Sequence, residues 1–437
     1  MQNADLLICG GKVLTLDEGD TILDPGDIAI RGDTILEIGQ NLPEKYQSST
    51  TLDARDQLLM PGLVNAHAHA AMTLFRGLAD DLALMDWLEN HIFPAENRFM
   101  SPEHVYLGTL LACCEMIRSG TTTLCDGYFF EEEAARAVHD AGLRGVMAQG
   151  IIDFPSPDAP DPQEGLRLAE EFICRWKGSD RIRPALFCHS TYTCGPQTIR
   201  EVKKVAEKHH VPLGIHLAET QQEVREIMQR YGKRPVRHLA DLGVLDETLM
   251  AVHCVWLDPH EIDLLHKFKV KAVHVPESNM KLASGISPVP ALLQRGITVG
   301  LGTDGCASNN DLDLFQEMDS AAKLHKVFAQ DPTVLNARQV VRMATAEGAA
   351  VLGLPREIGS LEPGKKADII TLDLQKPHLL PLYNLYSHLV YTFNGADVNS
   401  VIVNGTLLMR NRKFLHLDED QLLERIVDLS GEITKVR

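Results

Sequence analysis

The 437-residue sequence lacks any apolar run long enough to span a bilayer, and Met1 to Asp5 lack the basic residues that open a signal peptide. Positive charge is also scarce. There are 42 lysines and arginines against 60 acidic residues, and the net charge of −18 argues against a nucleic-acid or anionic-membrane partner. The nine cysteines include no CxxC pair and no even-numbered framework of the secreted type. These absences predict a cytoplasmic protein with reduced thiols.

The overall amino-acid composition is that of a globular protein. Hydrophobic residues make up 44% of the chain and charged residues 23%. The length exceeds that of one small domain but fits one (β/α)8 barrel with an accessory domain.

The middle of the chain alternates strand-like and helix-like segments. The strand-like segments are residues 63–69, 121–126, 144–149, 185–189, 213–219, 250–256, 272–276 and 298–304. Residues 102–119, 197–209 and 220–242 are helix-like. Eight such units in about 300 residues are typical of a closed parallel barrel. An open doubly wound sheet is the alternative, but no glycine-rich dinucleotide-binding motif follows the first segment.

Both ends of the chain also contain short strand-like runs. They are residues 6–9, 12–16, 27–30, 34–38, 367–372 and 398–403. Neither end has enough strands for a core of its own, so we expect the two ends to combine. The predicted fold is therefore α/β, with a small β-sandwich domain (1–59 plus 362–437) and a TIM-type barrel (60–361).

A His-x-His pair ends the first strand-like segment of the barrel, shortly after the turn pair Pro61-Gly62. Residues i and i+2 of a strand point to the same face, so His67 and His69 can reach one point in space. Neutral imidazole is a common ligand of zinc and related divalent metals. Alone, such a pair is weak evidence for a metal site.

Polar side chains end four further strand-like segments: His189, His216, His253 and Asp304. In a barrel of this kind the catalytic groups come from the C-terminal ends of the strands. His67, His69, His216 and Asp304 would suit a divalent ion that retains a water. The alternative, a polar residue at each loop entrance, is reasonable for any one position but weak for five strand ends together.

Glu219 lies three residues after His216, where the strand-like segment ends. A carboxyl group there can turn into the mouth of the barrel and carry protons to and from a substrate. The alternative is a carboxylate at the N-terminus of the following helix.

Several motifs together resemble the amidohydrolase superfamily, in its mononuclear deaminase branch. They are PGLVNAHAH (61–69), HLAE (216–219), VHC (252–254), SNMKLASG (278–285), GTDG (302–305) and GSLEPGKKAD (359–368). The resemblance implies a barrel with a catalytic metal. Zinc is the default, although iron or manganese would also suit three nitrogens and one oxygen.

The fourth strand-like segment bears on the number of metal ions. Binuclear members of the superfamily carry a carboxylated lysine there, but this chain has Phe187-Cys188-His189-Ser190. The resemblance therefore implies one metal ion and makes binuclear amide or phosphotriester hydrolysis less favoured.

The segment after the first barrel strand resembles 5′-methylthioadenosine/S-adenosylhomocysteine deaminases. The matching stretches are residues 75–81, 85–88 and 93–96. The resemblance implies that Glu96 contacts the ribose hydroxyls and that His189 also binds substrate. A carboxylate suits a vicinal diol, since it accepts two hydrogen bonds at once. Trp87 would line the apolar end of the substrate or serve in the core.

One departure from the family pattern concerns the substrate. Many members place an arginine just after the third barrel strand, where it meets the carboxylate of S-adenosylhomocysteine, but residues 146–150 contain none and Arg144 precedes the strand. We therefore favour 5′-methylthioadenosine, with S-adenosylhomocysteine and adenosine as further candidates.

The reaction implied is hydrolytic deamination of the adenine ring, which yields the inosine analogue and ammonia. Glu219 would protonate N1, while His253 and Asp304 would receive protons from the attacking water. Guanine or cytosine deamination and triazine dechlorination are alternatives within the branch, and a non-catalytic barrel is the alternative outside it. The family also favours a homo-oligomer.

Overall fold

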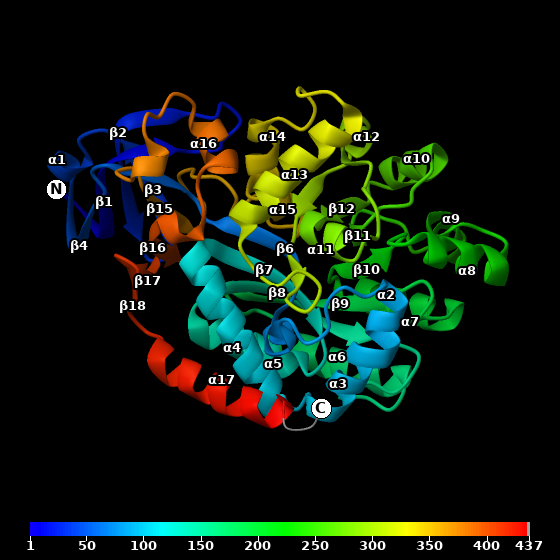
Figure 1. The fold of residues 1–437 in the computed structure, drawn as a ribbon. Coiled ribbons are helices and arrows are strands. Elements are labelled where there is room, and N and C mark those ends of the chain that lie inside the picture. Colours follow the sequence, from blue (N-terminus) through cyan, green and yellow to red (C-terminus); the bar gives the residue numbers. More distant parts are fainter. Residues whose placement is uncertain (435–437) are drawn as a thin grey trace.

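In the computed structural model, residues 1–434 are described, and their strands form two nine-stranded sheets (Figure 1). One sheet is parallel and belongs to the middle of the chain. The other is mixed and joins the two ends of the chain. Within the described residues, no helix has the length and apolar character needed to cross a membrane.

The parallel sheet is arranged in the order β13-β12-β11-β10-β9-β8-β7-β6-β14. Its strands are β6 (Leu63–His69), β7 (Thr121–Tyr128), β8 (Arg144–Ile151), β9 (Ile182–Ser190), β10 (Leu213–Leu217), β11 (Leu249–His253), β12 (Lys271–His274), β13 (Val299–Leu301) and β14 (Asp304–Gly305). The sheet curls until β14 pairs in parallel with β6, where Asp304 lies opposite Ala68 and Gly305 opposite His69. This is the strand arrangement of the predicted TIM-type α/β fold.

Apolar side chains from alternate positions of these strands fill the inside of the curled sheet. Val64 and Ala66 on β6 belong to the same buried cluster as Val146 and Ala148 on β8. Since residues two apart on a strand face the same side, the cluster forms a layer across the interior. Phe187, on β9, lies in this cluster too.

Helices follow most of these strands and cover the outside of the sheet (Figure 1). They are α4 (Pro102–Ser119), α5 (Glu131–Ala141), α6 (Pro162–Trp176), α7 (Pro196–His209), α8 (Gln221–Tyr231), α9 (Pro235–Leu242), α10 (Pro259–Lys267), α11 (Pro276–Lys281), α12 (Val289–Gln294), α13 (Leu314–Ala329), α14 (Ala337–Met343) and α15 (Ala346–Val351).

The prediction of one helix over residues 220–242 is wrong. Helix α8 ends at Tyr231 and is capped by Gly232, whose φ of 69° lies in the left-handed region, and α9 begins at Pro235. Glycine adopts this conformation without strain, and proline lacks the amide hydrogen that a continuing helix needs.

A shorter segment connects β6 to α4 and contributes one wall of the cavity described below. It contains η1 (Ala70–Phe75), α2 (Leu84–Trp87), η2 (Leu88–Ile92) and α3 (Phe93–Phe99). Its apolar side chains Trp87, Leu88 and Ile92 are buried.

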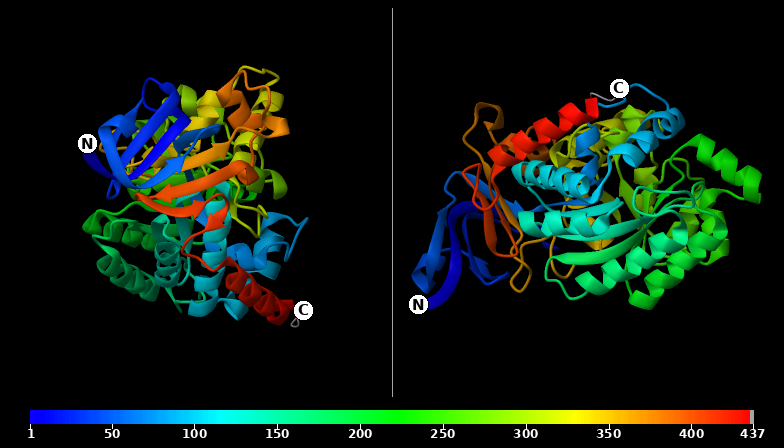
Figure 2. Two further views of the ribbon diagram at one scale, coloured as in Figure 1. Left: turned by 90° about the vertical axis from the view of Figure 1, so that its left-hand side faces the viewer. Right: turned by 90° about the horizontal axis from the view of Figure 1, so that it is seen from below.

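The mixed sheet brings together the two ends of the chain. Its strands are β1 (Gln2–Leu14), β2 (Ile22–Arg31), β3 (Thr34–Gly39), β4 (Tyr46–Asp53), β5 (Gln57–Pro61), β15 (Ile369–Asp373), β16 (Val398–Val403), β17 (Thr406–Arg410) and β18 (Lys413–Phe414), with α1 (Leu42–Lys45) before β4. Strand β5 lies between β1 and β15 and so links the N-terminal and C-terminal strands. Figure 2 shows the blue and orange-red strands side by side at one end of the molecule.

The strands of this sheet differ from the prediction in several places. Strands β5, β17 and β18 were not predicted, and further differences concern β1 and β4. The run 6–9 and residues 12–14 of the run 12–16 belong to the single strand β1, whose register shifts near Gly11. Strand β4 was not predicted, because its polar sequence YQSSTTLD carries no apolar alternation; its parallel pairing with β1 forms it.

Helices near the C-terminus pack on the middle of the chain. Helix α16 (Leu385–Tyr391) contacts α13 and α14, and α17 (Glu419–Thr434) contacts α4. Two short 3-10 helices, η3 (Pro377–Leu379) and η4 (Gly395–Asp397), flank α16.

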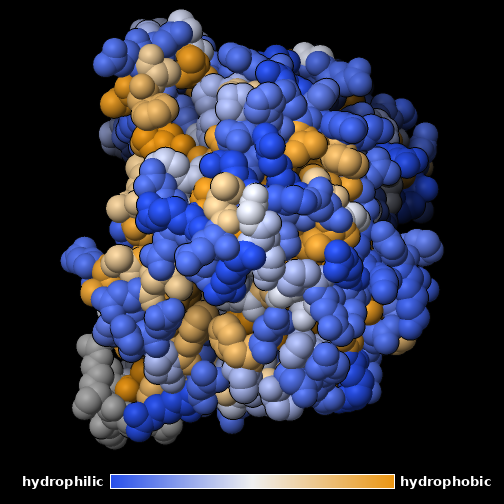
Figure 3. Space-filling view, turned by 90° about the vertical axis from the view of Figure 1, so that its right-hand side faces the viewer, coloured by the Kyte–Doolittle hydropathy of each residue, from blue (hydrophilic) through white to orange (hydrophobic). Residues whose placement is uncertain are grey.

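The face of the molecule shown in Figure 3 is mostly hydrophilic, with apolar side chains in small separate groups.

A buried ion pair joins the two sheets. Arg144, at the start of β8, donates from Nε to Asp368 Oδ2 at 2.8 Å and from Nη2 to Asp368 Oδ1 at 3.1 Å. Its Nη2 also donates to Asn404 Oδ1 at 3.0 Å. Arg144 is 1% exposed and Asp368 4%. This arginine, noted in the sequence only as preceding the third strand, has a structural partner away from the barrel mouth.

Candidate active site and metal centre

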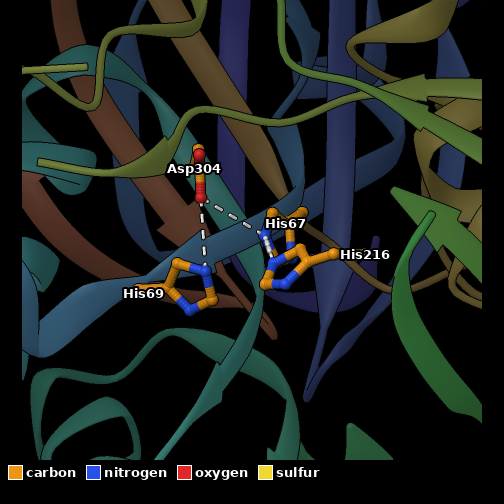
Figure 4. A group of neighbouring side chains, drawn as sticks. All are labelled: His67, His69, His216 and Asp304. Carbon is orange, nitrogen blue, oxygen red and sulfur yellow. Dashed lines mark hydrogen bonds and ion pairs between the residues drawn. The ribbon is translucent and has the colours of Figure 1, made fainter. Parts of the chain in front are cut away.

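Three imidazoles and one carboxylate point toward one another at the C-terminal ends of the barrel strands (Figure 4). They belong to His67, His69, His216 and Asp304, and one possible ligand atom from each lies within 4.8 Å of all the others. Asp304 Oδ1 is 3.4 Å from His67 Nε2 and 3.2 Å from His69 Nε2, and His216 Nε2 is 3.2 Å from His67 Nε2. The structure thus brings together the four predicted metal ligands.

The strand ends and their neighbours fix the orientation of these side chains. The His69 Nδ1 atom is 2.6 Å from the Gly127 carbonyl oxygen, which can only accept a hydrogen bond. His69 therefore carries its proton on Nδ1 and presents Nε2 to the cluster. Ser278 and Ser308 donate to Asp304 Oδ2 at 2.6 and 3.0 Å, which leaves Oδ1 facing the histidines.

The protonation of the cluster suits a cation. Burial raises the pKa of Asp304, but hydrogen bonds from His67 and His69 outweigh this, and the pKa lies well below the usual range. Burial lowers the pKa of His67 to about 4 and that of His216 well below its ordinary value. Burial also disfavours charge on His69, but Asp304 beside it leaves its pKa raised. The charged carboxylate of Asp304 and the neutral imidazoles of His67 and His216 are in the form that binds metal ions, and His69 would release a proton from Nε2 on binding one.

Glu219 and His253 form a second group beside the first. Glu219 Oε2 lies 3.7 Å from His253 Nε2, and Ser284 donates to Glu219 Oε1 at 3.3 Å. Both side chains are buried, and burial raises the pKa of Glu219. A carboxyl group with a raised pKa holds a proton nearer to neutral pH, as a proton donor requires.

Two residues that the sequence analysis did not single out hold this second group in place. Asn279 Oδ1 lies 2.9 Å from His253 Nδ1, so the ring is protonated on Nδ1 and its Nε2 is free to accept a proton. Glu223 accepts from the backbone amides of Ala218 and Glu219 at 3.1 and 2.8 Å. Ala218 has a φ of 52°, so these bonds hold a turn that directs Glu219 inward.

A cavity of about 740 Å³, the open space at its mouth included, extends from these groups. Apolar side chains line much of it: Met72, Leu84, Trp87, Leu88, Ile92, Phe93, Phe129, Ile151, Ile152 and Leu282. Trp87, which is 5% exposed, lines the cavity and donates from Nε1 to the Ala79 carbonyl oxygen at 3.1 Å.

The remaining predicted substrate contacts also line the cavity. Glu96 accepts a hydrogen bond from the Tyr128 hydroxyl at 2.6 Å, and burial raises the pKa of Glu96 to about 7. His189 Nδ1 lies 2.8 Å from Thr193 Oγ1. Glu219, His253 and Asp304 line the same cavity, so one space reaches every predicted catalytic and substrate-binding side chain.

Comparison with known proteins identifies the family. The model of the amidohydrolase family matches residues 58–408. The chain belongs to the amidohydrolase family. This confirms the resemblance predicted from the sequence motifs.

Three proteins resemble this amidohydrolase over almost its whole length. A 5-methylthioadenosine/S-adenosylhomocysteine deaminase of Syntrophus aciditrophicus is 51% identical, over 98% of this chain and 97% of the relative. A 5′-deoxyadenosine deaminase of Methanosarcina acetivorans is 46% identical, over 98% of both chains. The crystal structure of an adenosine deaminase from Xanthomonas campestris with bound zinc superposes with a TM-score of 0.97 at 37% identity, and the match covers 99% of each chain.

These findings establish the general chemistry of the amidohydrolase. It is a hydrolase that acts on carbon–nitrogen bonds of a small-molecule substrate. The His/His/His/Asp cluster and the family together indicate a divalent metal as cofactor.

Proposed function

We propose that this amidohydrolase deaminates the adenine ring of 5′-methylthioadenosine and related nucleosides, forming the inosine analogue and ammonia. The observation that carries the proposal is the single cavity. It connects the His/His/His/Asp cluster and Glu219 with the carboxyl group of Glu96, across a mostly apolar lining. The relatives named as deaminases of 5′-substituted adenosines support the same substrate class.

We propose zinc as the metal, held by His67, His69, His216 and Asp304. The donor set of three nitrogens and one carboxylate oxygen fits zinc. When bound, such an ion lowers the pKa of a water molecule and so supplies a nucleophile near neutral pH. Strand β9 carries no lysine between Ile182 and Ser190, which supports a single ion.

The proposed proton transfers use three side chains. Glu219 donates a proton to N1 of the adenine ring, which makes C6 electrophilic, and water then adds at C6. His253 Nε2 and Asp304 share the one proton that this water releases. The Glu219 carboxylate then takes the proton of the hydroxyl group added at C6 and passes it to the amino group, and the C6–N6 bond breaks to release ammonia and leave a carbonyl group at C6.

Three further side chains that line the cavity suit the rest of the substrate. We propose that Glu96 accepts hydrogen bonds from the ribose hydroxyls, that His189 also binds the nucleoside, and that Trp87 lies beside the apolar 5′ group. Within the described residues, no lysine or arginine lines the cavity. A carboxylate on the 5′ substituent would lack a cation, so 5′-methylthioadenosine should be preferred to S-adenosylhomocysteine.

For the molecule as a whole, we propose a β-sandwich domain (1–59 plus 362–437) joined to the barrel (60–361). The mixed sheet, in which β5 links strands from both ends, supports this division. We further propose a cytoplasmic homo-oligomer that does not bind nucleic acid; the net charge of −18 supports the last point.

The test compares wild-type protein with Glu219→Gln on 5′-methylthioadenosine, S-adenosylhomocysteine, adenosine, guanine, cytosine and a chlorotriazine. Wild type should release ammonia with the highest kcat/KM on 5′-methylthioadenosine. Glu219→Gln should retain one equivalent of zinc by elemental analysis yet lose about 10²–10⁴-fold in kcat, the contribution of a general acid.

Glu424→Gln, on the exposed face of α17, is the matched control and should match wild type. Full activity of Glu219→Gln would contradict the proton-transfer role. Turnover of guanine, cytosine or the triazine without any adenosine analogue would contradict the substrate class.

A further inference from the structure

Two adjacent residues at the end of β7 each hold a side chain that lines the substrate cavity. The Gly127 carbonyl oxygen lies 2.6 Å from His69 Nδ1, in the proposed metal centre. The Tyr128 hydroxyl donates to Glu96 Oε1, also at 2.6 Å. One strand end therefore contacts both the metal side and the proposed ribose side of the site.

The Tyr128 hydroxyl is fixed as a hydrogen-bond donor. Its side chain is almost fully buried, at 3% exposure, and its ring packs 5.1 Å from the Phe129 ring and 6.1 Å from the His69 ring, between centroids. Burial and the nearby Glu96 carboxylate raise the phenol pKa well above its ordinary value, so the proton stays on oxygen. Glu96, which accepts from it, must orient one oxygen toward Tyr128.

The carboxylate retains capacity for a ligand. Within residues 1–434, the Glu96 side chain has a single hydrogen-bond partner, the Tyr128 hydroxyl. A carboxylate offers about four acceptor positions, of which Tyr128 uses one. A vicinal diol brings two donors, so the remaining positions match a ribose and are not filled by the protein.

We propose that Tyr128 is a positioning residue: it holds the Glu96 carboxylate in the orientation that accepts both ribose hydroxyls, at a spacing from the metal centre set by β7. The proposal rests on the proposed function, because Glu96 must be the ribose contact. Glu96 lies on α3, a seven-residue helix in the segment that crosses the cavity, and the hydrogen bond ties this segment to a barrel strand.

The consequence is a specificity for nucleosides with both hydroxyls. A nucleoside without them leaves the buried Glu96 carboxylate without donors from the ligand, which costs binding free energy. This penalty depends on the carboxylate being held at the ribose, so it should shrink when Tyr128 no longer holds it.

The experiment measures kcat and KM for 5′-methylthioadenosine and its 2′,3′-dideoxy analogue, with wild type, Tyr128→Phe and Glu96→Gln. Wild type should prefer the ribonucleoside. Tyr128→Phe should lower kcat/KM for the ribonucleoside about ten- to a hundredfold, mainly through KM, the range expected for a hydrogen bond to a charged group. Its kcat/KM for the dideoxy analogue should change less than threefold, so the preference shrinks.

Tyr106→Phe is the matched control. Tyr106 on α4 also donates to a carboxylate, Asp140 Oδ2 at 3.1 Å, but on the exposed surface, so its removal should leave both substrates unaffected. Melting temperatures of all variants establish that each is folded.

The outcomes separate this proposal from the proposed function. If wild type deaminates neither compound, the proposed function fails and this proposal with it. Suppose that wild type prefers the ribonucleoside and Glu96→Gln loses this preference. If Tyr128→Phe then keeps the full preference, or loses both activities equally, the positioning role is overturned while the function stands. A reduced preference in Tyr128→Phe with the dideoxy rate retained supports it.

Discussion

Glu96 is the residue whose charge should control substrate affinity near neutral pH. Burial raises its pKa to about 7, although the Tyr128 hydrogen bond acts in the opposite direction. Below that pH the carboxyl group is neutral and accepts hydrogen bonds less well. Above it, the carboxylate can accept both ribose hydroxyls. Affinity for a ribonucleoside should therefore rise with pH through 7.

The measurement is the ratio of kcat/KM for 5′-methylthioadenosine over its 2′,3′-dideoxy analogue, from pH 5.5 to 8.5. The ratio cancels the titration of groups that act on the base alone. In wild type it should rise by up to about tenfold per pH unit below 7 and level off above it. In Glu96→Gln the ratio should be independent of pH; a wild-type ratio that is flat would refute the assignment.

The residues of the site differ in how far the sequence could reveal them. His67 and His69 could be predicted because strand geometry places alternate residues on one face, and the end of a barrel strand is where catalytic groups occur. Tyr128 and Asn279 act on residues 32 and 26 positions away, and nothing local distinguishes them from a core tyrosine or a loop asparagine. Their roles could therefore be recognised only from the folded structure.

Among the secondary structure elements, the connection from β13 to β14 determines where Asp304 lies. A Cβ atom at Gly302 would lie 2.8 Å from both the backbone nitrogen and the backbone oxygen of His67. Thr303 donates to the His67 carbonyl oxygen at 3.1 Å, and Asn65 donates to Thr303 Oγ1 at 2.8 Å. The connection thus lies against β6, and glycine is needed for this close approach.

Gly302→Ala should push β14 away from β6. The expected cost is about 1–3 kcal/mol of unfolding free energy, as for other overpacked sites, together with loss of bound metal on dialysis because Asp304 shifts. Urea unfolding and elemental analysis check this. In Gly39→Ala the added methyl meets only Leu42 Cδ2 at 3.6 Å, so that variant should match wild type. Full metal retention in a destabilised Gly302→Ala would contradict the link to Asp304.

Element boundaries could be predicted where the chain signals them locally. Residues 102–119 form α4 with the predicted bounds, helped by the Ser101 cap, Pro102 and Gly120. The break between α8 and α9 also has local signals in Gly232 and Pro235, which the helical pattern obscured. Strand β4 has none, since it exists through its neighbour β1.

At the scale of the whole molecule, Arg144 couples the barrel to the mixed sheet. Removing one partner of a buried ion pair leaves the other charge uncompensated, which costs about 3–5 kcal/mol. Arg144→Met should therefore lower the unfolding free energy by about this amount, because Asp368 and Asn404 lose their partner. Urea unfolding, followed by fluorescence and by activity, provides the measurement.

Arg183→Met is the control at the surface. Arg183 pairs with Glu357 at 2.9 Å, but the two side chains are 45% and 30% exposed, so its loss should cost less than about 1 kcal/mol. The double variant Arg144→Met/Asp368→Leu should recover part of the stability, because no buried charge remains. Equal effects of Arg144→Met and Arg183→Met would show that the buried pair does not join the two parts.

The closure of the parallel sheet by β14 has a consequence for the order of assembly. Asn65 and Thr303, which contact each other beside the cluster, are 238 residues apart in the chain. During synthesis at about 5–20 residues per second, His67 and His69 leave the ribosome many seconds before Asp304 does. The complete ligand set therefore exists only once the barrel has closed, and bound metal reports a finished fold.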